Sequence, residues 1–435
     1  MSLYILFKKE KSIGIFLSFY LFFSIFCFLV APFPVYNINK LKTILYASLS
    51  WSLFGWGYFY KNAKINKLNA YEVLYKNPSY IVISLSAFIV VVTLARLISL
   101  GYSINIKSIL ISMSDLGGSY FLKWGIMKDW QERKNLFVQF YNISSFVHLL
   151  LIPFAFLYWK RIKKIAKVFF IVALLIRLLP GIITGTMIDV FVVFVELGMC
   201  MFILISKEQL TKNVKKAFYI SIIILIVIFI IFGIKAMLNR ADYLGWAPWQ
   251  GLQRWYYNPN NILAGIIGER IGFGLNSLIW YLGHGYEGLG QCLELPFVWT
   301  YGIGHSRALM EYADQYLGWD WVWDRHYLWR NYKITGRDPL RYWPTALVWM
   351  ASDVTFIGVL FILFFIGKLT RRFWVQSMIV NDPILIAIFN RIVLLILFLP
   401  MNLQIFQGRV MWWGTIGLVI VWYVHKKIRK IRYIC

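Results

Sequence analysis

Ten long apolar stretches alternate with polar segments along this chain, and their spacing predicts its architecture. A helix needs about 20 apolar residues to cross a bilayer core roughly 30 Å thick, and each stretch approaches that length. Apolar runs of this kind predict transmembrane helices rather than half-buried strands. We therefore expect an all-α polytopic membrane protein with spans at 13–34, 43–60, 80–101, 141–159, 166–186, 187–206, 217–237, 343–367, 383–405 and 408–424.

Basic residues mark every second gap between these stretches, and this pattern predicts the orientation of the chain. Loops rich in lysine and arginine stay on the cytoplasmic side of a membrane. Ten spans then place both termini in the cytoplasm. The basic clusters fall at 8–11, 61–76, 160–164, 207–216, 368–372 and 426–432.

The composition agrees with a membrane protein, and the charge distribution argues against nucleic acid as a partner. Of the 435 residues, 60% are hydrophobic and 15% are charged, whereas about a quarter of a soluble chain is charged. The net charge of +26 is concentrated in the predicted cytoplasmic segments, so its expected partner is the anionic inner surface of the bilayer and no nucleic acid. One membrane domain is expected over 1–435.

Two predicted outward-facing loops, 102–140 and 238–342, are long for a compact domain, and loops of this length are usually functional. The loop 238–342 is expected to be partly helical, with helices near 265–280 and 289–295 and another beginning at His305. It contains nine Trp and eleven Tyr but only two Phe. Rings with a polar tip suit both a membrane interface and stacking against sugars, and the sequence leaves both interpretations open.

Charged residues that fall inside predicted spans point to function, because each costs roughly 2.5–3.5 kcal/mol to place at mid-bilayer. Internal ion pairing is the alternative interpretation, for example Arg177 with Asp189. Arginine also binds phosphate through its planar fork, so at least one arginine is expected to bind an anion. The intramembrane candidates are Arg96, Arg177, Asp189, Glu196, Asp353, Arg391 and Arg409, and the favoured loop arginines are Arg254, Arg270, Arg307 and Arg341.

Three of the five histidines, His284, His305 and His326, lie in the loop 238–342. Histidine is the usual general base near neutral pH, although a structural role is the more frequent outcome. Their spacing fits no zinc motif, so no metal is expected. A helix beginning at Gly304 and His305 would also offer unpaired backbone N–H groups to a phosphate.

The layout and two segments resemble bacterial O-antigen and capsule repeat-unit polymerases, the Wzy family. The segments are 281–307 (YLGHGYEGLGQCLELPFVWTYGIGHSR) and 349–358 (WMASDVTFIG). The resemblance implies a GT-C-like fold, no cofactor, and a place in the bacterial inner membrane with 238–342 as a large periplasmic loop. It also implies a substrate, undecaprenyl-diphosphate-linked oligosaccharide, and makes a chain-length regulator protein an expected partner.

In such a polymerase, a sugar hydroxyl of one lipid-linked repeat attacks the anomeric carbon of the growing chain, and the lipid diphosphate leaves. The resemblance assigns the general base to His305 first, then to His284, then to Asp353. It assigns sugar binding to Trp299, Tyr301 and Trp321. It assigns the diphosphate to Arg254, Arg270, Arg307 and Arg341, with Arg177 or Arg409 at the membrane rim.

Two other classes of protein remain open. An O-antigen ligase shares the fold and the donor, so the sequence separates it poorly from a polymerase. A polysaccharide flippase or transporter would be expected to have two similar halves and short external loops. The length of the loop 238–342 and the absence of an internal repeat count against that second class.

Overall fold

A computed structural model describes most of the chain. The described residues are 3–36, 38–60, 71–72, 75–131, 135–207, 211–244, 249–250, 253–254, 257–340 and 342–428. Helices dominate them, and the strands form only two small ladders: β1 (Tyr71–Glu72) pairs in parallel with β4 (Val380–Asn381), and β2 (Trp249–Gln250) pairs antiparallel with β3 (Gln253–Arg254).

The longer helices follow the predicted spans. The first half of the chain forms α1 (Leu3–Val30), α2 (Lys40–Phe59), α3 (Pro78–Ser99), α4 (Ile106–Ser114), α5 (Leu116–Gln131), α6 (Leu136–Ser144), α7 (Phe146–Leu157), α8 (Lys164–Ile183), α9 (Met187–Ser206) and α10 (Lys212–Leu244). Three further long helices close the bundle: α17 (Ala346–Ile379), α18 (Pro383–Phe398) and α19 (Arg409–Ile428).

Every predicted span coincides with helix, but the number that could cross a membrane is smaller than ten. Within the described residues, six helices are long and apolar enough: α1, α3, α8, α9, α10 and α17. A seventh results if α6 and α7, which meet at an angle of 43°, act as one broken span. The predicted span 383–405 is too long, because α18 ends at Phe398 and the chain then turns through a 3-10 helix, η1 (Gln404–Phe406).

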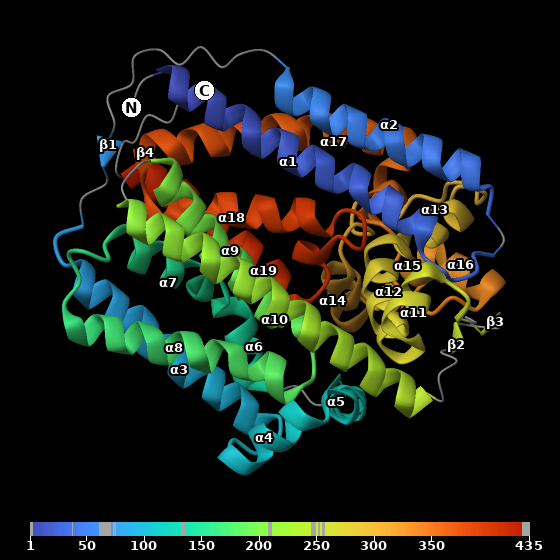
Figure 1. The fold of residues 1–435 in the computed structure, drawn as a ribbon, viewed down its shortest axis with the longest axis horizontal. Coiled ribbons are helices and arrows are strands. Elements are labelled where there is room, and N and C mark those ends of the chain that lie inside the picture. The colour runs from blue at the N-terminus through green and yellow to red at the C-terminus, as the bar shows by residue number, and fades with distance from the viewer. Residues whose placement is uncertain are drawn as a thin grey trace.

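The bundle has three layers (Figure 1). Helices α1, α2 and α17 form one layer and α3 and α8 form the opposite one, with α7, α9, α18 and α19 between them. A Cβ atom at Gly57 would overlap the backbone of Phe364, and one at Gly367 would overlap the backbone of Phe54. These glycines let α2 and α17 approach closely, as small residues do between membrane helices.

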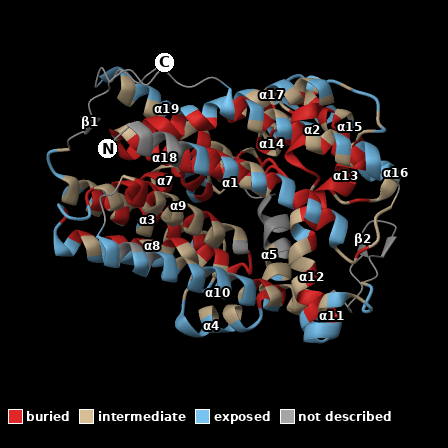
Figure 2. Cartoon of the chain, turned by 45° about the horizontal axis from the view of Figure 1, so that its top comes forward, coloured by how far each residue is buried: buried red, intermediate tan, exposed pale blue. Residues whose placement is uncertain are grey.

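Burial follows the same layers (Figure 2). Most of α18 is buried, whereas α10 exposes most of its described apolar side chains between Tyr219 and Ile231. Exposed isoleucine and valine side chains on α10 and α8 suit contact with lipid rather than with water. The chain is therefore a helical membrane protein with a polar and aromatic region at one end.

That region consists of six helices packed against one end of the bundle (Figure 1). They are α11 (Ile262–Ile267), α12 (Glu269–Gly283), α13 (Gly285–Cys292), α14 (Arg307–Leu317), α15 (Trp321–Arg325) and α16 (Tyr327–Thr335). The single helix expected over 265–280 is broken at Gly268, which adopts a φ of +84° that favours glycine. The helix expected at 289–295 lies earlier, at α13.

Candidate functional site

A break in α17 creates the centre of the candidate site. Thr355 interrupts the helix with φ +67°, which frees carbonyl groups near the break. The loop that follows α13 docks there: the backbone N–H and the side-chain hydroxyl of Thr300 both donate to the carbonyl of Ser352, at 3.2 and 2.7 Å. Tyr301 has φ +57° and is the other non-glycine residue with positive φ among the described residues. Strained backbone of this kind clusters at functional sites.

Asp353 lies on the helical turn before the break, and its carboxylate binds the docked loop through several hydrogen bonds. Its carboxylate accepts hydrogen bonds from the backbone N–H of Gly304 at 3.0 Å and from the backbone N–H of His305 at 2.8 Å, and it shares the single proton of the Thr300 hydroxyl with the carbonyl of Ser352. The N–H groups expected to bind phosphate are thus occupied by a carboxylate. A carboxylate with this many donors stays ionised and fixed in orientation.

The same carboxylate fixes the imidazole of His305. The Nδ1 atom of His305 lies 2.9 Å from Oδ2 of Asp353, and the His305 side chain is 32% exposed while that of Asp353 is 8% exposed. Among the described residues no hydrogen bond is made to Nε2. When Nδ1–H donates a hydrogen bond to Asp353, Nε2 carries the free lone pair, which is the arrangement that a general base requires.

Two neighbouring residues hold the loop that carries His305. Ser306 caps α14 by accepting a hydrogen bond from the N–H of Leu309, and its hydroxyl donates to the carbonyl of Phe406 at 2.7 Å. Fully buried His326 bonds through Nε2 to the carbonyl of Gly304 at 3.0 Å. Burial lowers the pKa of His326 to about 3, so this side chain is a neutral structural group.

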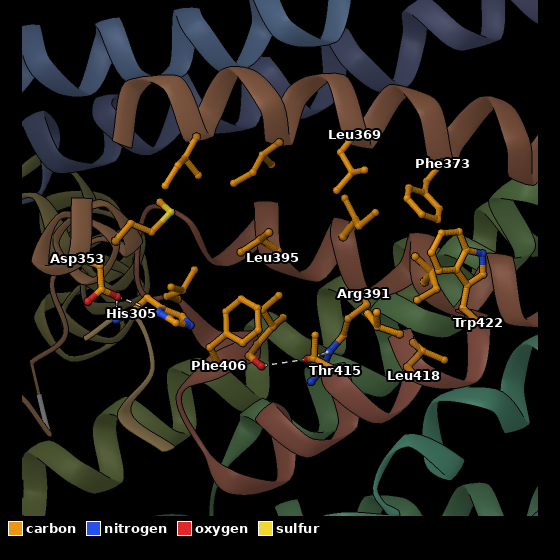
Figure 3. A pocket seen from close by; sticks show the side chains of 18 of the residues that line it. His305, Asp353, Leu369, Phe373, Arg391, Leu395, Phe406, Thr415, Leu418 and Trp422 are labelled. Atoms are coloured by element: carbon orange, nitrogen blue, oxygen red, sulfur yellow. Dashed lines mark hydrogen bonds and ion pairs between the residues drawn. The ribbon is translucent and has the colours of Figure 1, made fainter. Parts of the chain in front are cut away.

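A large apolar cavity begins at His305 and Asp353. Its volume is about 670 Å³, and it runs between α17, α18 and α19 with an almost wholly apolar lining. Figure 3 shows His305 and Asp353 at one end and Phe373 and Trp422 at the other. The ring centroids of Phe373 and Trp422 lie 5.6 Å apart, so these two side chains connect α17 with α19 at that far end. Between the ends, the lining residues Leu369 and Val419 are exposed, so the cavity opens sideways between α17 and α19.

Arg307 and Arg409, both expected to bind diphosphate, lie next to each other near this cavity. Glu311 joins them: its Oε1 accepts from Nε of Arg307 at 2.7 Å and its Oε2 accepts from Nε of Arg409 at 3.2 Å. Because both arginines use Nε for this contact, Glu311 orients the two guanidinium groups and partly neutralises them. Arg409 also donates through Nη2 to Gln315.

The other predicted arginines do not join this cluster. Arg177 is buried and forms a bidentate pair with Glu196 at 2.7 and 2.8 Å, so its carboxylate partner is Glu196 and not the expected Asp189. Arg270 pairs with Asp242 at the exposed surface. The side chain of Arg254 and the whole of Arg341 lie outside the described residues.

His284, the second candidate base, lies in a buried structural network. Its carbonyl accepts a hydrogen bond from Arg337 at 3.0 Å, and Arg337 also pairs with Glu287 at 2.8 Å. Burial, with the Arg337 charge beside it, lowers the pKa of His284 to about 3. His284 does not line the large cavity. This environment fits a structural histidine better than a base.

The three aromatic residues expected to bind sugar form one exposed cluster beside His305. The ring centroids of Trp299 and Tyr301 are 4.6 Å apart, and those of Tyr301 and Trp321 are 5.3 Å apart. The guanidinium of Arg325 lies 5.2 Å from the centre of the Tyr301 ring. Because Gly302 and His305 line the cavity, this cluster adjoins its mouth.

Sequence reasoning missed three members of the site. Thr300 and Glu311 carried no motif, and their roles depend on partners 53 and 98 residues away, Asp353 and Arg409. Phe406, whose ring packs edge-on against His305 with the ring centroids 5.6 Å apart, falls in the two-residue gap between the predicted spans 383–405 and 408–424. Within the described part of the chain, no three His, Cys, Asp or Glu side chains gather as a metal site would require.

Comparisons of the chain with models of protein families, with curated proteins and with solved structures found no match. Function is therefore inferred from the chemistry of the site and from the resemblance of the segments 281–307 and 349–358.

Proposed function

We propose that this protein is a glycosyltransferase of the bacterial inner membrane that polymerises oligosaccharide repeat units carried on undecaprenyl diphosphate. The observation that carries the proposal is the His305–Asp353 pair at the mouth of an apolar cavity that opens sideways between membrane helices. Such a site offers a base to a polar acceptor and an apolar space to a lipid, side by side. An aqueous hydrolase needs no opening toward lipid.

In the proposed reaction, Nε2 of His305 takes the proton from the attacking sugar hydroxyl as its oxygen bonds to the anomeric carbon of the donor. The bond between that carbon and the diphosphate breaks, and the electron pair leaves with the lipid diphosphate. Asp353 orients the imidazole and stabilises the imidazolium that forms. General base catalysis of this kind is worth roughly 10²–10⁴-fold in rate.

The leaving diphosphate needs fixed positive charge where its own charge develops. Arg307 and Arg409, held together by Glu311, supply it next to the dyad. The acceptor oligosaccharide lies on Trp299, Tyr301 and Trp321, whose flat exposed faces suit sugar rings.

The hydrocarbon chain of the lipid lies in the cavity between α17 and α19. Beyond the break at Thr355, Ile362 and Phe373 both line it and are 11 residues apart, which corresponds to about 16 Å of helix at 1.5 Å per residue. That length is about half of the roughly 30 Å core of a bilayer. The hydrocarbon chain of the lipid enters through the lateral opening beside Leu369 and Val419.

The proposal includes the finer topology that the sequence predicts. Ten spans of a GT-C-like bundle, with α2, α18, α19 and the bent α6–α7 pair inserted along with the six long apolar helices, place both termini in the cytoplasm and the site at the periplasmic face. A chain-length regulator protein is the expected protein partner.

Deletion of the gene tests this function. A polymerase is supported if surface polysaccharide loses its long ladder on a gel while single repeat units remain attached to the core. Loss of all attached sugar contradicts the polymerase and favours a ligase or a flippase. Lipid-linked sugar stranded outside then indicates the ligase, and sugar stranded inside indicates the flippase.

A further inference from the structure

Arg325 lies among the three aromatic rings beside His305, and three contacts hold its side chain there. Its Nε donates to the carbonyl of Trp299 at 2.7 Å. The centre of its guanidinium lies 5.2 Å from the centre of the Tyr301 ring and 5.8 Å from the centre of the Trp321 ring. A guanidinium at such distances from an aromatic ring is attracted to it. Arg325 is therefore fixed at the exposed cluster on which the acceptor oligosaccharide is proposed to lie.

The outer end of this guanidinium is open to a ligand. Arg325 is partly buried, and neither Nη1 nor Nη2 makes a hydrogen bond within the described part of the chain. Neither atom is among the buried atoms that lack a partner, so both reach the surface. No carboxylate of the described residues forms an ion pair with Arg325, and the preceding residue, Asp324, pairs with Lys333 at 2.7 Å. Nη1 and Nη2 together form a pair of donors that suits the two oxygens of a carboxylate.

The other arginines between 257 and 340 are paired with a carboxylate or lie on a buried ring. Arg270, Arg307 and Arg337 each form an ion pair with a carboxylate. Arg330 donates through Nη2 to the carbonyl of Pro296 at 2.6 Å, and its guanidinium lies 4.9 Å from the centre of the Tyr327 ring, which is buried. Arg325 is the one arginine of this described range that has no carboxylate partner and lies against exposed rings.

The position of Arg325 is coupled to the loop that carries His305. The next residue, His326, is fully buried and bonds through Nε2 to the carbonyl of Gly304 at 3.0 Å. Arg325 bonds to the carbonyl of Trp299 at the other end of the same loop. Two successive residues thus attach the end of α15 to this loop at two points. A group that binds to Arg325 therefore has a defined place relative to the base.

We propose that Arg325 binds a carboxylate on the acceptor oligosaccharide, so that the site selects repeat units that contain a uronic acid or another carboxylated sugar. The role of the aromatic cluster as the acceptor site rests on the proposed function. The rings of Tyr301 and Trp321 hold the apolar face of a sugar. Nη1 and Nη2 hold its carboxylate through two parallel N–H···O bonds, which a neutral hydroxymethyl group cannot match.

A lipid headgroup is the competing ligand, since aromatic and basic side chains also gather where a membrane meets water. Anionic bilayer surfaces are bound by clusters of lysine and arginine. Around Arg325 the chain is instead rich in acid: Asp314, Asp320 and Asp324 are exposed on α14 and α15 or at their ends. Arg325 thus offers one directed contact rather than a basic patch, and this favours a single carboxylate on a sugar.

The test measures binding of two tetrasaccharides to the purified full-length chain by titration calorimetry in a nonionic detergent. The β-1,4-linked tetramer of glucuronic acid and cellotetraose share their ring stereochemistry and linkage, and they differ in the carboxylates. The wild type should bind the acidic tetramer at least about tenfold more tightly, the effect of one charge-assisted contact. Arg325→Gln should remove that difference. Arg330→Gln, which removes the same charge from a buried ring, should retain it, and Trp321→Ala should weaken the binding of both tetramers.

Equal affinity of the wild type for the two tetramers, or binding of neither, overturns the proposal without any variant, which covers the case in which Arg325→Gln fails to fold. A difference that survives in full in Arg325→Gln overturns it too, because the acidic tetramer then binds elsewhere. An equal loss in Arg330→Gln shows that net charge, and not the fork of Arg325, selects the acidic tetramer. Co-purified phosphatidylglycerol that falls in Arg325→Gln, while the difference between the tetramers persists, identifies a lipid headgroup as the ligand instead.

The two proposals fail separately. No sugar is transferred in the binding assay, so a negative result there leaves the polymerase proposal standing. A gene deletion that leaves the long polysaccharide ladder intact contradicts the polymerase, but it does not change whether Arg325 distinguishes the two tetramers.

Discussion

For His305 and Asp353, the sequence predicted the residues, and the structure added the contact between them. Both were candidates from their sequence contexts, because histidine and carboxylate side chains are the usual bases. Their cooperation could not be predicted, since it depends on a loop docking into the break of α17, 48 residues further along the chain. The two residues are parts of one unit rather than competing choices for the base.

Replacement of Asp353 tests that unit. Asp353→Asn keeps the size of the side chain but removes its charge and replaces one of its two acceptor oxygens with an NH2 donor, although both oxygens accept hydrogen bonds in the structure. Activity should fall by about 10²-fold or more, because the imidazole loses its fixed tautomer. The measurement is the rate of sugar transfer at matched protein levels in the membrane. Activity within a few-fold of wild type would show that Asp353 does not orient His305.

Glu311 provides a second test among single residues. It holds Arg307 and Arg409 together, so Glu311→Gln should raise KM for the lipid-linked donor about tenfold while kcat changes less, as expected when ground-state binding is lost. Glu294→Gln is the control, because Glu294 pairs with Lys42 at an exposed position. Equal effects of the two substitutions would remove Glu311 from donor binding.

At the level of helices, hydrophobic periodicity located all ten stretches but not their interruptions. The end of α18 at Phe398 is marked by Pro400, the usual signal of a helix end, which the prediction of a span over 383–405 overlooked. The break at Thr355 has no glycine or proline next to it, and it depends on tertiary contacts, such as the docking of Thr300 onto Ser352, that a local pattern does not encode.

The lateral opening between α17 and α19 can be blocked with a matched pair of substitutions on one helix. Val419 and Val424 are each 45% exposed, but only Val419 lines the cavity. Val419→Trp should reduce transfer from lipid-linked donors at least about tenfold, because the bulky ring obstructs the chain. Val424→Trp should leave it near wild type. Identical activity of the two variants would mean that lipid does not use this opening.

The helices packed on the end of the bundle should be sensitive to acid. His284 and His326 have pKa values of about 3 in the folded chain, against about 6.5 unfolded. The unfolded state therefore binds more protons as pH falls below about 6.5, and folding loses stability. At pH 5 the loss is about 2 kcal/mol for each histidine.

Thermal unfolding of the detergent-purified protein at pH 7.5 and pH 5 measures this loss. The wild type should unfold at a clearly lower temperature at pH 5, and His326→Gln, which cannot titrate, should lose less. Equal unfolding temperatures of the wild type at both pH values would show that these histidines are accessible to protons in the folded state.

For the whole molecule, composition and charge were enough to establish a helical membrane protein. They overestimated how many helices stand out as spans, since six described helices are long and apolar enough, or seven with the bent pair. The shortfall comes from α18, which is apolar but only 16 residues long, and from α2 and α19, which carry polar or small residues among their 20. Because α17 lines the cavity and still qualifies as a span, length and local polarity decide which helices are recognised.

Reconstitution of the purified chain with one substrate tests the central claim most directly. A single oligosaccharide repeat on undecaprenyl diphosphate serves as both donor and acceptor, and the products are separated by length. The wild type should form lipid-linked products that grow by whole repeats, and His305→Ala should form none while remaining folded. Equal products from His305→Ala, or no lengthening by the wild type, would contradict a polymerase whose base is His305.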